Sequence, residues 1–144
     1  MILAHVHNII LLIVLGKSTS PMKYENRIAV IDCGTNTFHL LIVDVKENNR
    51  FTILHKEKYA VKIGEGGIEQ NILPEQGVKR ALKTLKQFKD KIDAFEVSTV
   101  TATATSAFRN ASNGKKIADL ILKETGIKIN IIDGTTEATL IYKG

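Results

Sequence analysis

The chain has 144 residues, of which 44% are hydrophobic and 24% charged, a composition that suits one soluble globular domain with a sizeable core. Its single cysteine, Cys33, excludes an internal disulfide and favours a reducing, cytoplasmic setting, and we interpret it as a small buried apolar residue. The net charge of +5 is spread along the chain, and neither zinc-finger spacing nor a glycine–aromatic RNA-binding signature is present, so nucleic acid is not an expected partner.

The first 21 residues differ in character from the rest of the chain. Their apolar run, Ile9 to Leu15, has seven residues, whereas a helix that spans a bilayer needs about 20. No basic residue precedes Lys17, although a signal peptide begins with a basic segment. A second methionine at Met22 makes residues 1–21 an expected disordered or mis-translated leader, with a membrane-associated leader as the alternative. Residues 22–144 are then the expected domain.

Three segments with the composition of β-strands follow the leader, at residues 27–33, 38–45 and 50–64. The first two are short runs of aliphatic residues, and the third carries β-branched and aromatic residues. Asn48 and Asn49 favour a tight hairpin turn between the second and the third. We therefore expect an antiparallel meander.

Strands and helices alternate in the second half of the chain. Pro74 suits the first turn of a helix, and apolar residues at helical spacing follow it from Val78 to Ile92. The further expected elements are a strand over residues 95–105, a helix over 114–126, a strand over 127–132 and a last helix that begins at Thr135 or Thr136. The order β-β-β-α-β-α-β-α predicts an α/β fold, because the strands that alternate with helices pair in parallel and give a mixed sheet.

A first candidate site lies in the turn between the first two strands, in the sequence DCGTNT. Asp32 ends a buried strand, where a carboxylate must be paired, hydrogen-bonded or near a metal. Gly34 allows close approach of the backbone to a ligand, and Thr35, Asn36 and Thr37 offer hydroxyl, amide and N–H donors to an anion. These residues suit a bound phosphate with a hydrated cation near Asp32. An ordinary turn, closed by Asp32 and Asn36 through local hydrogen bonds, explains them equally well.

Two further candidates are Arg109 and Glu137. Arg109 stands among uncharged residues at the end of the predicted fourth strand, and its guanidinium matches phosphate oxygens. The alternative for Arg109 is an exposed side chain beside a helix cap. Glu137 follows a strand in the first turn of a helix, where it is either a capping residue or a general base that deprotonates an attacking water. Asp133 is interpreted as a turn residue.

Three segments together resemble the exopolyphosphatase and guanosine pentaphosphate phosphohydrolase (Ppx/GppA) family. They are AVIDCGTNTFHLLIVDV, TATATSAFRNASNG and IKINIIDGTTEATLIYKG, which occur in the family's order and spacing. The resemblance extends over residues 27–144 and implies the actin-like ATPase (ribonuclease H-like) fold. Serine is common in the family where this chain has Thr35 and Thr37, but the hydroxyl groups remain.

The resemblance also implies roles for individual residues. Residues 32–37 match the family's first phosphate-binding loop, with Asp32 near the metal, directly or through water. Arg109 matches a phosphate-contacting arginine, and Glu137 matches the glutamate that activates water. Family members hydrolyse terminal phosphoanhydride bonds of inorganic polyphosphate or of the alarmone pppGpp with Mg²⁺, and commonly form homodimers; a membrane partner is not expected.

The family's sequence continues with a second glycine-rich loop, D-x-G-G-G-S, and no such motif occurs here. We therefore expect the N-terminal lobe of a two-lobed enzyme, inactive or nearly so by itself, because phosphoryl transfer depends on positioning from both lobes. Two other hypotheses remain. One is a small-molecule kinase of the same superfamily, for which a water-activating glutamate has no use. The other is a non-catalytic lobe that binds polyanions.

Overall fold

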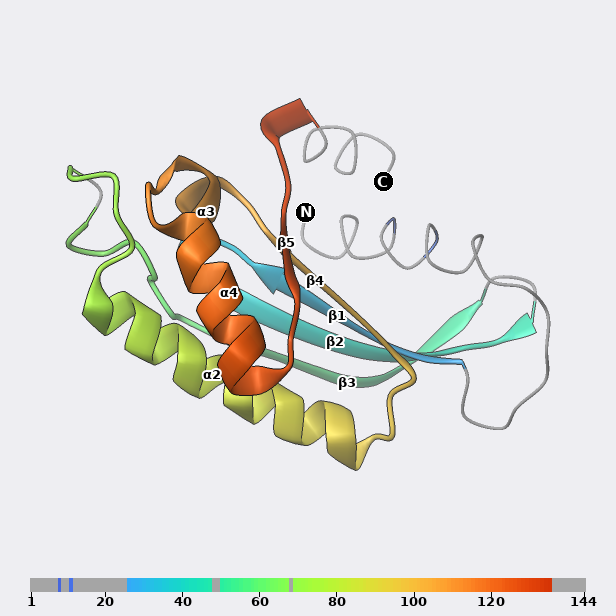
Figure 1. The fold of residues 1–144 in the computed structure, drawn as a ribbon. Helices are drawn as coiled ribbons and strands as arrows, with labels where there is room; N and C mark the ends of the chain where they lie inside the picture. The colour runs from blue at the N-terminus through green and yellow to red at the C-terminus, as the bar shows by residue number, and fades with distance from the viewer. Residues whose placement is uncertain (1–7, 9–10, 12–25, 48–49, 68, 136–144) are drawn as a thin grey trace.

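The structure is a computed structural model that describes residues 8, 11, 26–47, 50–67 and 69–135 (Figure 1). The predictions for the leader and for the Asn48–Asn49 turn fall outside the described residues, apart from Asn8 and Leu11. The last helix also falls outside them, except that Gly134 and Thr135 are helical. No helix within the described ranges is long and apolar enough to cross a membrane.

A five-stranded mixed sheet in the order β3-β2-β1-β4-β5 forms the centre of the fold. Strands β1 (Arg27–Cys33), β2 (Phe38–Val45) and β3 (Phe51–Tyr59) pair antiparallel, so the predicted meander is confirmed. Strands β4 (Thr99–Ala104) and β5 (Ile129–Ile131) extend the sheet in parallel from β1. The mixed sheet expected from the order of the elements is therefore present, with β1 at its centre.

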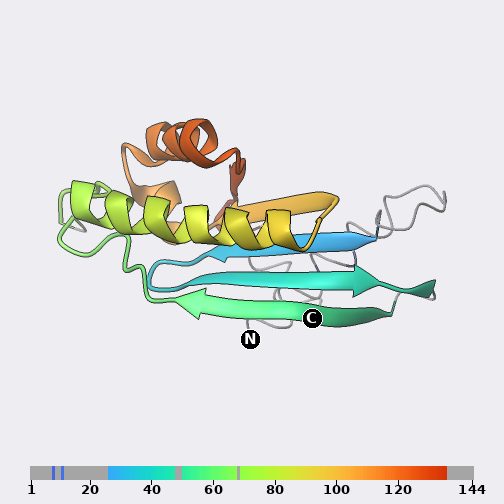
Figure 2. The ribbon, with the colours of Figure 1, turned by 90° about the horizontal axis from the view of Figure 1, so that it is seen from below.

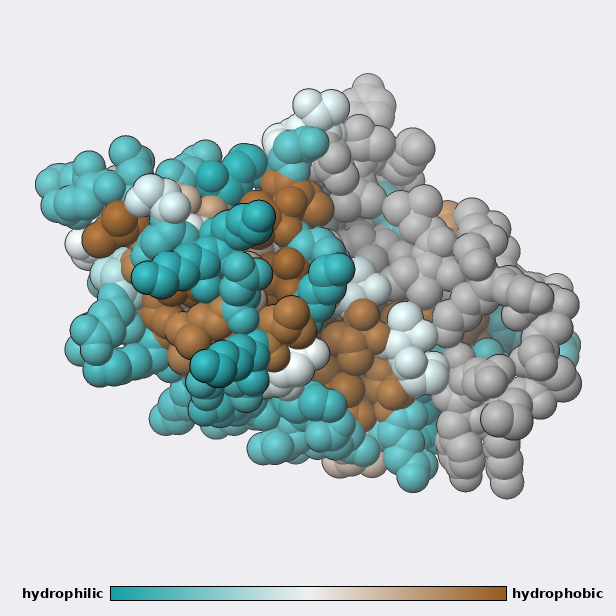
Figure 3. Space-filling view, viewed as in Figure 1, coloured by the Kyte–Doolittle hydropathy of each residue, from teal (hydrophilic) through white to brown (hydrophobic). Residues whose placement is uncertain are grey.

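Helices α2 (Glu75–Ala94), α3 (Ser106–Asn110) and α4 (Gly114–Thr125) pack on one face of this sheet (Figures 1 and 2). The apolar stripe predicted for α2 is buried, including Leu85 and Phe88, which are fully enclosed. The basic residues of α2 lie mostly on its outer surface, and Figure 3 shows apolar residues between the hydrophilic surfaces of α2 and α4. Lysines spaced around an amphipathic helix thus form a solvated face.

The third strand is shorter than predicted. It ends at Tyr59, and Val61 and Ile63 leave the sheet to join the core beneath the helices. Lys62, between them, has a left-handed backbone (φ 47°) and its N–H donates to the carbonyl of Asn36 at 2.9 Å. Apolar and polar residues thus continue to alternate after the strand has ended, because the apolar residues of this loop are also buried.

Helix α3 was not predicted from the sequence. It has five residues and only one buried side chain, Phe108, so it lacks the repeated apolar stripe that identifies longer helices. The fourth strand is correspondingly shorter than the predicted 95–105, because Phe95 caps α2 and Thr105 is the N-cap of α3. This short helix brings Ser106 close to the end of β1 and Arg109 close to the segment that follows β5.

The sheet has a second apolar face, opposite the three helices. Ile28 and Val30 of β1 and Leu41 and Val43 of β2 form a separate buried cluster there. Side chains alternate between faces along a strand, so Asp32 and His39, which pair in register, continue this second face toward the turn. Thr103 pairs with Asp32 from β4 and lies on the same face.

Candidate functional site

The turn between β1 and β2 is closed by its own backbone. The N–H of Gly34 donates to the carbonyl of Thr37 at 3.1 Å. A Cβ atom at Gly34 would stand 2.9 Å from the same carbonyl oxygen, closer than real Cβ contacts allow. Glycine is therefore required here to let the two ends of the turn approach one another.

The three residues after Gly34 leave backbone donors available. Among the hydrogen bonds of the described residues, none uses the N–H groups of Thr35, Asn36 or Thr37. Asn36 is exposed, and both threonines are partly accessible. Successive N–H groups in a turn form concave sites for anions, so the turn can bind phosphate oxygens without a charged side chain.

Asp32 lies beneath this turn and is only 9% exposed. Its register partner on β4, Thr103, is 6% exposed, and within the described part of the chain the Thr103 hydroxyl has no hydrogen-bond partner. Leaving a buried hydroxyl unpaired costs about 1–3 kcal/mol. The Thr103 hydroxyl, next to Asp32 on the adjacent strand, is therefore a group to which a bound ligand could hydrogen-bond.

His39 faces the same region from β2. Burial lowers the pKa of the His39 imidazole, the charges of Lys58 and Lys56 lower it further, and the Asp32 carboxylate opposes this shift. The imidazole is consequently held toward its neutral form between one acidic and two basic neighbours. Thr37, His39 and Lys58 also line a shallow hollow on this side of the turn.

We expect the pKa of His39 to make the fold less stable in acid. Because the folded-state pKa lies below the ordinary value of about 6.5, the unfolded chain takes up the proton more readily as pH falls through that value. The contribution of His39 to the free energy of unfolding is thus present above pH 6.5 and declines below it. Urea unfolding at pH 5.5 and 7.5 should show a smaller pH difference for His39→Gln than for the parent chain. An equal difference in both would contradict this assignment.

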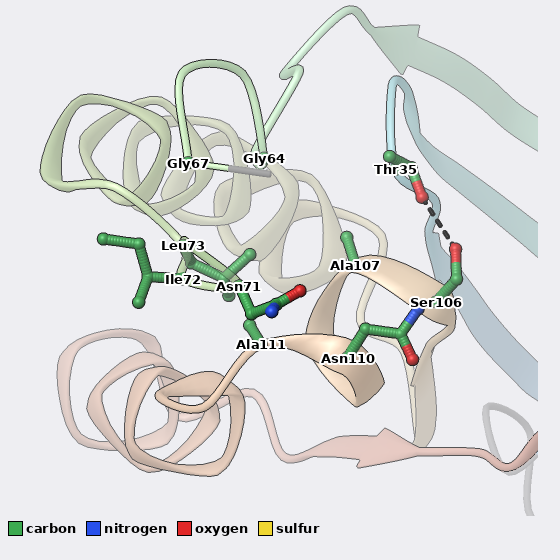
Figure 4. Close-up of a pocket in the computed structure, with 10 residues that line it drawn as sticks. All are labelled: Thr35, Gly64, Gly67, Asn71, Ile72, Leu73, Ser106, Ala107, Asn110 and Ala111. Carbon is green, nitrogen blue, oxygen red and sulfur yellow. Dashed lines mark hydrogen bonds between the residues drawn. The ribbon is translucent and has the colours of Figure 1, made fainter. Parts of the chain in front are cut away.

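Thr35 and Ser106 join the turn to helix α3. Their hydroxyl oxygens are 3.0 Å apart in a hydrogen bond between residues that are distant in sequence (Figure 4). Either hydroxyl can act as the donor, so each can turn toward a ligand that offers an acceptor. Ser106 thus belongs to the site, although no local pattern in the sequence indicates it.

Arg109, on the same short helix, contacts the chain that follows β5. Its Nη1 donates to the carbonyl of Ile132 at 3.0 Å, and the Ile132 N–H donates to the carbonyl of Ala104 at 3.0 Å. Arg109 is therefore not a fully exposed side chain beside a cap: it is partly buried and holds the segment that leads toward Glu137. Glu137 itself lies outside the described residues. Hydrogen bonds among the described residues therefore link the turn to α3, and α3 to the segment at the end of β5.

A cavity of about 190 Å³ opens beside the turn, between α3 and the loop that precedes α2 (Figure 4). Thr35 and Ser106 line one end, and the backbone at Gly64 and Gly67 borders the loop side. Gly67 has no room for a side chain, because a Cβ atom would overlap the carbonyl of Ile72. The loop is therefore folded tightly upon itself along this wall.

Asn113 connects that loop to the junction between α3 and α4 through hydrogen bonds. Its side-chain oxygen accepts from the N–H of Leu73 at 2.8 Å, and its side-chain nitrogen donates to the Leu73 carbonyl at 2.9 Å. The neighbouring N–H of Ser112 donates to the carbonyl of Asn71 at 2.7 Å. These bonds connect residues about 40 positions apart and hold the cavity wall in place.

Replacing Asn113 by alanine is expected to destabilise the chain by about 1–3 kcal/mol, because both backbone groups of the buried Leu73 lose their partner. Chemical denaturation measures this loss, and hydrogen exchange at the Leu73 amide should accelerate with it. The exposed neighbour Asn110 provides the control: Asn110→Ala should change stability by less than about 0.5 kcal/mol. Equal stabilities for the two variants would show that Asn113 does not fasten the loop.

Cys33 is a packing residue in this structure. Its side chain is 1% exposed, and burial, with a smaller effect of Asp32, raises the pKa of the thiol well above its usual value. The sequence interpretation of Cys33 as a buried apolar residue therefore agrees with its position.

Comparison with known proteins identifies close relatives. The model of the Ppx/GppA phosphatase family matches residues 41–144. The bifunctional 3-dehydroquinate synthase/phosphatase of Fusobacterium nucleatum is 37% identical over an alignment of 130 residues, and the match covers 85% of this chain and 20% of that protein. The guanosine-5'-triphosphate,3'-diphosphate pyrophosphatase of Pseudoalteromonas translucida is 33% identical, covering 83% of this chain and 24% of that protein.

A solved structure supports the same relationship. The crystal structure of an exopolyphosphatase from Cytophaga hutchinsonii superposes with a TM-score of 0.78 at 49% sequence identity. It covers 82% of this chain and 38% of that protein. The likeness confirms the predicted actin-like lobe with its mixed sheet. This chain therefore spans between about a fifth and two fifths of the length of these three relatives.

Proposed function

Because the chain belongs to the Ppx/GppA phosphatase family, we propose that it forms the phosphate-binding lobe of a cytoplasmic enzyme that hydrolyses terminal phosphoanhydride bonds. The substrate is inorganic polyphosphate or pppGpp, the classes of molecule that the relatives' names indicate. Residues 22–144 make up the lobe in this proposal. Its main support is the junction of the Gly34–Thr37 turn with α3, where open N–H groups lie beside the Thr35 and Ser106 hydroxyls.

The proposed reaction is attack of water on the terminal phosphorus. Glu137 accepts a proton from the water as the new P–O bond forms, and the bond to the bridging oxygen breaks with its electron pair on the departing phosphate. The N–H groups of Thr35, Asn36 and Thr37 stabilise the charge on the terminal phosphoryl oxygens. Arg109 contributes in two ways: it contacts phosphate, and its bond to the Ile132 carbonyl holds the chain directly after β5.

The described residues fit a hydrated Mg²⁺ ion. Asp32 supplies a carboxylate at the base of the turn, and the unpaired hydroxyl of Thr103 supplies a second oxygen on the neighbouring strand. Mg²⁺ in phosphoryl-transfer sites commonly keeps several waters and binds one or two carboxylates together with the substrate phosphates. Among the described residues there is no cluster of three or more acidic, histidine or cysteine side chains, so Asp32 would act with water and substrate. When bound, the ion neutralises phosphate charge.

A complete protein that contains this lobe tests the proposal. With Mg²⁺ present, it should release inorganic phosphate from tripolyphosphate or pppGpp, and Arg109→Ala should lower kcat/KM about 10²-fold or more. Transfer of the phosphoryl group to an added sugar or carboxylic acid, in place of water, would contradict hydrolysis and support the kinase hypothesis.

The 144-residue chain by itself should bind tripolyphosphate with little or no phosphate release, because it spans only about a fifth to two fifths of its relatives' length and, in this proposal, residues beyond that span form the other side of the cleft. Fast release by this chain would refute the proposed dependence on a second lobe. A complete protein that binds but never cleaves would make the lobe a polyanion-binding module. Homodimerisation of the complete protein, part of the same proposal, is measured by sedimentation.

A further inference from the structure

We propose that the cavity beside the phosphate-binding turn binds an uncharged heterocyclic base, so that the lobe selects a guanosine-type nucleotide over plain polyphosphate. This inference rests on the proposed function and specifies its substrate class. The cavity is the space of about 190 Å³ between α3 and the described loop residues 64–67 and 71–73 (Figure 4).

The chemistry of the cavity wall favours an uncharged occupant over a phosphate chain. None of the ten described residues that line it is charged. Two are hydroxyl residues (Thr35 and Ser106), two carry amides (Asn71 and Asn110), and the other six are glycine or aliphatic. A polyphosphate chain carries negative charge on every unit and is held by cationic groups or arrays of N–H donors. A neutral group matches this wall better.

Size and polarity together indicate a single base. Pockets for drug-sized ligands measure about 300–1,000 Å³, so this smaller cavity suits one ring system rather than a whole nucleotide. Leu73 and Ala107 line the cavity and provide apolar contact for a planar ring, whereas the Ile72 side chain points away from Ala107 and Asn110 (Figure 4). Each side-chain amide of Asn71 and Asn110 offers donors and an acceptor, the combination that reads the edge of a purine.

The cavity wall is built before any ligand arrives. Asn113 holds Leu73 through two hydrogen bonds, and Ser112 holds Asn71 through a third. The loop closes on itself where the N–H of Ile72 donates to the Gly67 carbonyl at 3.1 Å. A preformed wall lowers the entropy lost on binding, which favours a specific ligand.

The position of the cavity links base recognition to phosphate binding. Thr35 belongs both to the turn and to the cavity wall, and its hydroxyl meets that of Ser106 at the boundary between them. One nucleotide can therefore occupy the two places together, with its phosphates at the turn and its base in the cavity. Inorganic polyphosphate has no group to place in the cavity.

Affinities of the 144-residue chain for GTP and for tripolyphosphate test the proposal, because both probes end in the same triphosphate and differ in the nucleoside. We expect GTP to bind at least about 10-fold more tightly. Ala107→Leu fills the cavity and should remove most of this preference while leaving the affinity for tripolyphosphate unchanged. Asn110→Ala, which adds no bulk, should also reduce it. The control Ala94→Leu, at the exposed end of α2, should retain it.

Equal affinity of the parent chain for the two probes would overturn the proposal, and so would a preference that survives both Ala107→Leu and Asn110→Ala. Unchanged tripolyphosphate binding serves as the check that Ala107→Leu folds. If neither triphosphate binds, the result counts against the phosphate-binding turn, and titration with guanosine alone then tests the cavity. Shifts of the Asn71 and Asn110 side-chain amide resonances in NMR spectra would support the cavity site, and unshifted resonances would refute it.

Discussion

Glu137→Gln in a complete protein that contains this lobe is expected to lower kcat by about 10²–10⁴-fold while leaving substrate affinity nearly unchanged. Glutamine keeps the size and polarity of the side chain but cannot accept the proton of the attacking water. The loss should therefore appear in the chemical step, and single-turnover phosphate release together with equilibrium binding of the substrate separates the two effects.

Glu124→Gln is the matched control for this experiment. Glu124 lies on the exposed surface of α4, where it is 3.9 Å from Lys86, and takes no part in the proposed site. An exposed ion pair of this kind contributes little to stability. The control should retain the parent kcat. A parent-like kcat for Glu137→Gln would reject the general-base role, and a large loss of binding would show that Glu137 holds the substrate instead.

Gly114→Ala is expected to produce one of the largest losses of stability of any single methyl addition in the described chain. Gly114 is the first residue of α4, and a Cβ atom there would overlap the carbonyl oxygen of Phe108. The obstructing atom belongs to the backbone of α3, so relief requires the α3–α4 corner to move. Overpacking of this kind costs about 1–3 kcal/mol and sometimes more. Thermal unfolding should show Tm lowered by about 2–8 °C for each kcal/mol.

The same variant should also disturb the site, because Arg109 and Asn113 lie on either side of the moved corner. Gly134→Ala is the control, since a Cβ atom at Gly134 would meet no other described atom within 4 Å. That variant should keep the parent Tm within about 2 °C. If Gly114→Ala were as stable as Gly134→Ala, the close approach of Gly114 to Phe108 would not hold in solution.

Local patterns in the sequence account for most of the fold. The continuous aliphatic runs of β1 and β2 are buried on both faces of the sheet, and the apolar stripe of α2 is buried at helical spacing; both patterns can be seen in the sequence. The end of β3 could not be found in this way, because Val61 and Ile63 alternate with polar residues as strand residues do. Their departure from the sheet depends on tertiary contacts with α2, where Gly77 lies against the Ile63 carbonyl.

The sequence locates the turn between the first two strands, and its role as an anion site stays a prediction. Contacts between distant segments could not be predicted from the sequence. The DCGTNT sequence indicated an anion-binding turn, but Ser106 and Asn113 act through partners about 70 and 40 positions away. Small polar residues of this type occur in every loop, so no local signal separates them from ordinary turn residues. Asn113 is the N-cap residue of α4, and that position by itself does not indicate a contact with Leu73.

The position of β1 between β2 and β4 has a consequence for the order of folding. The meander forms from neighbouring segments, whereas the other edge of β1 pairs only with β4, after the whole of α2 has been made. Arg27 and Ser98 complete that closure through bonds across about 70 positions. Until then a newly synthesised chain presents an open apolar edge, the kind of surface on which strands of other molecules aggregate. Chains that stop short of Ala104 should consequently depend most on chaperones.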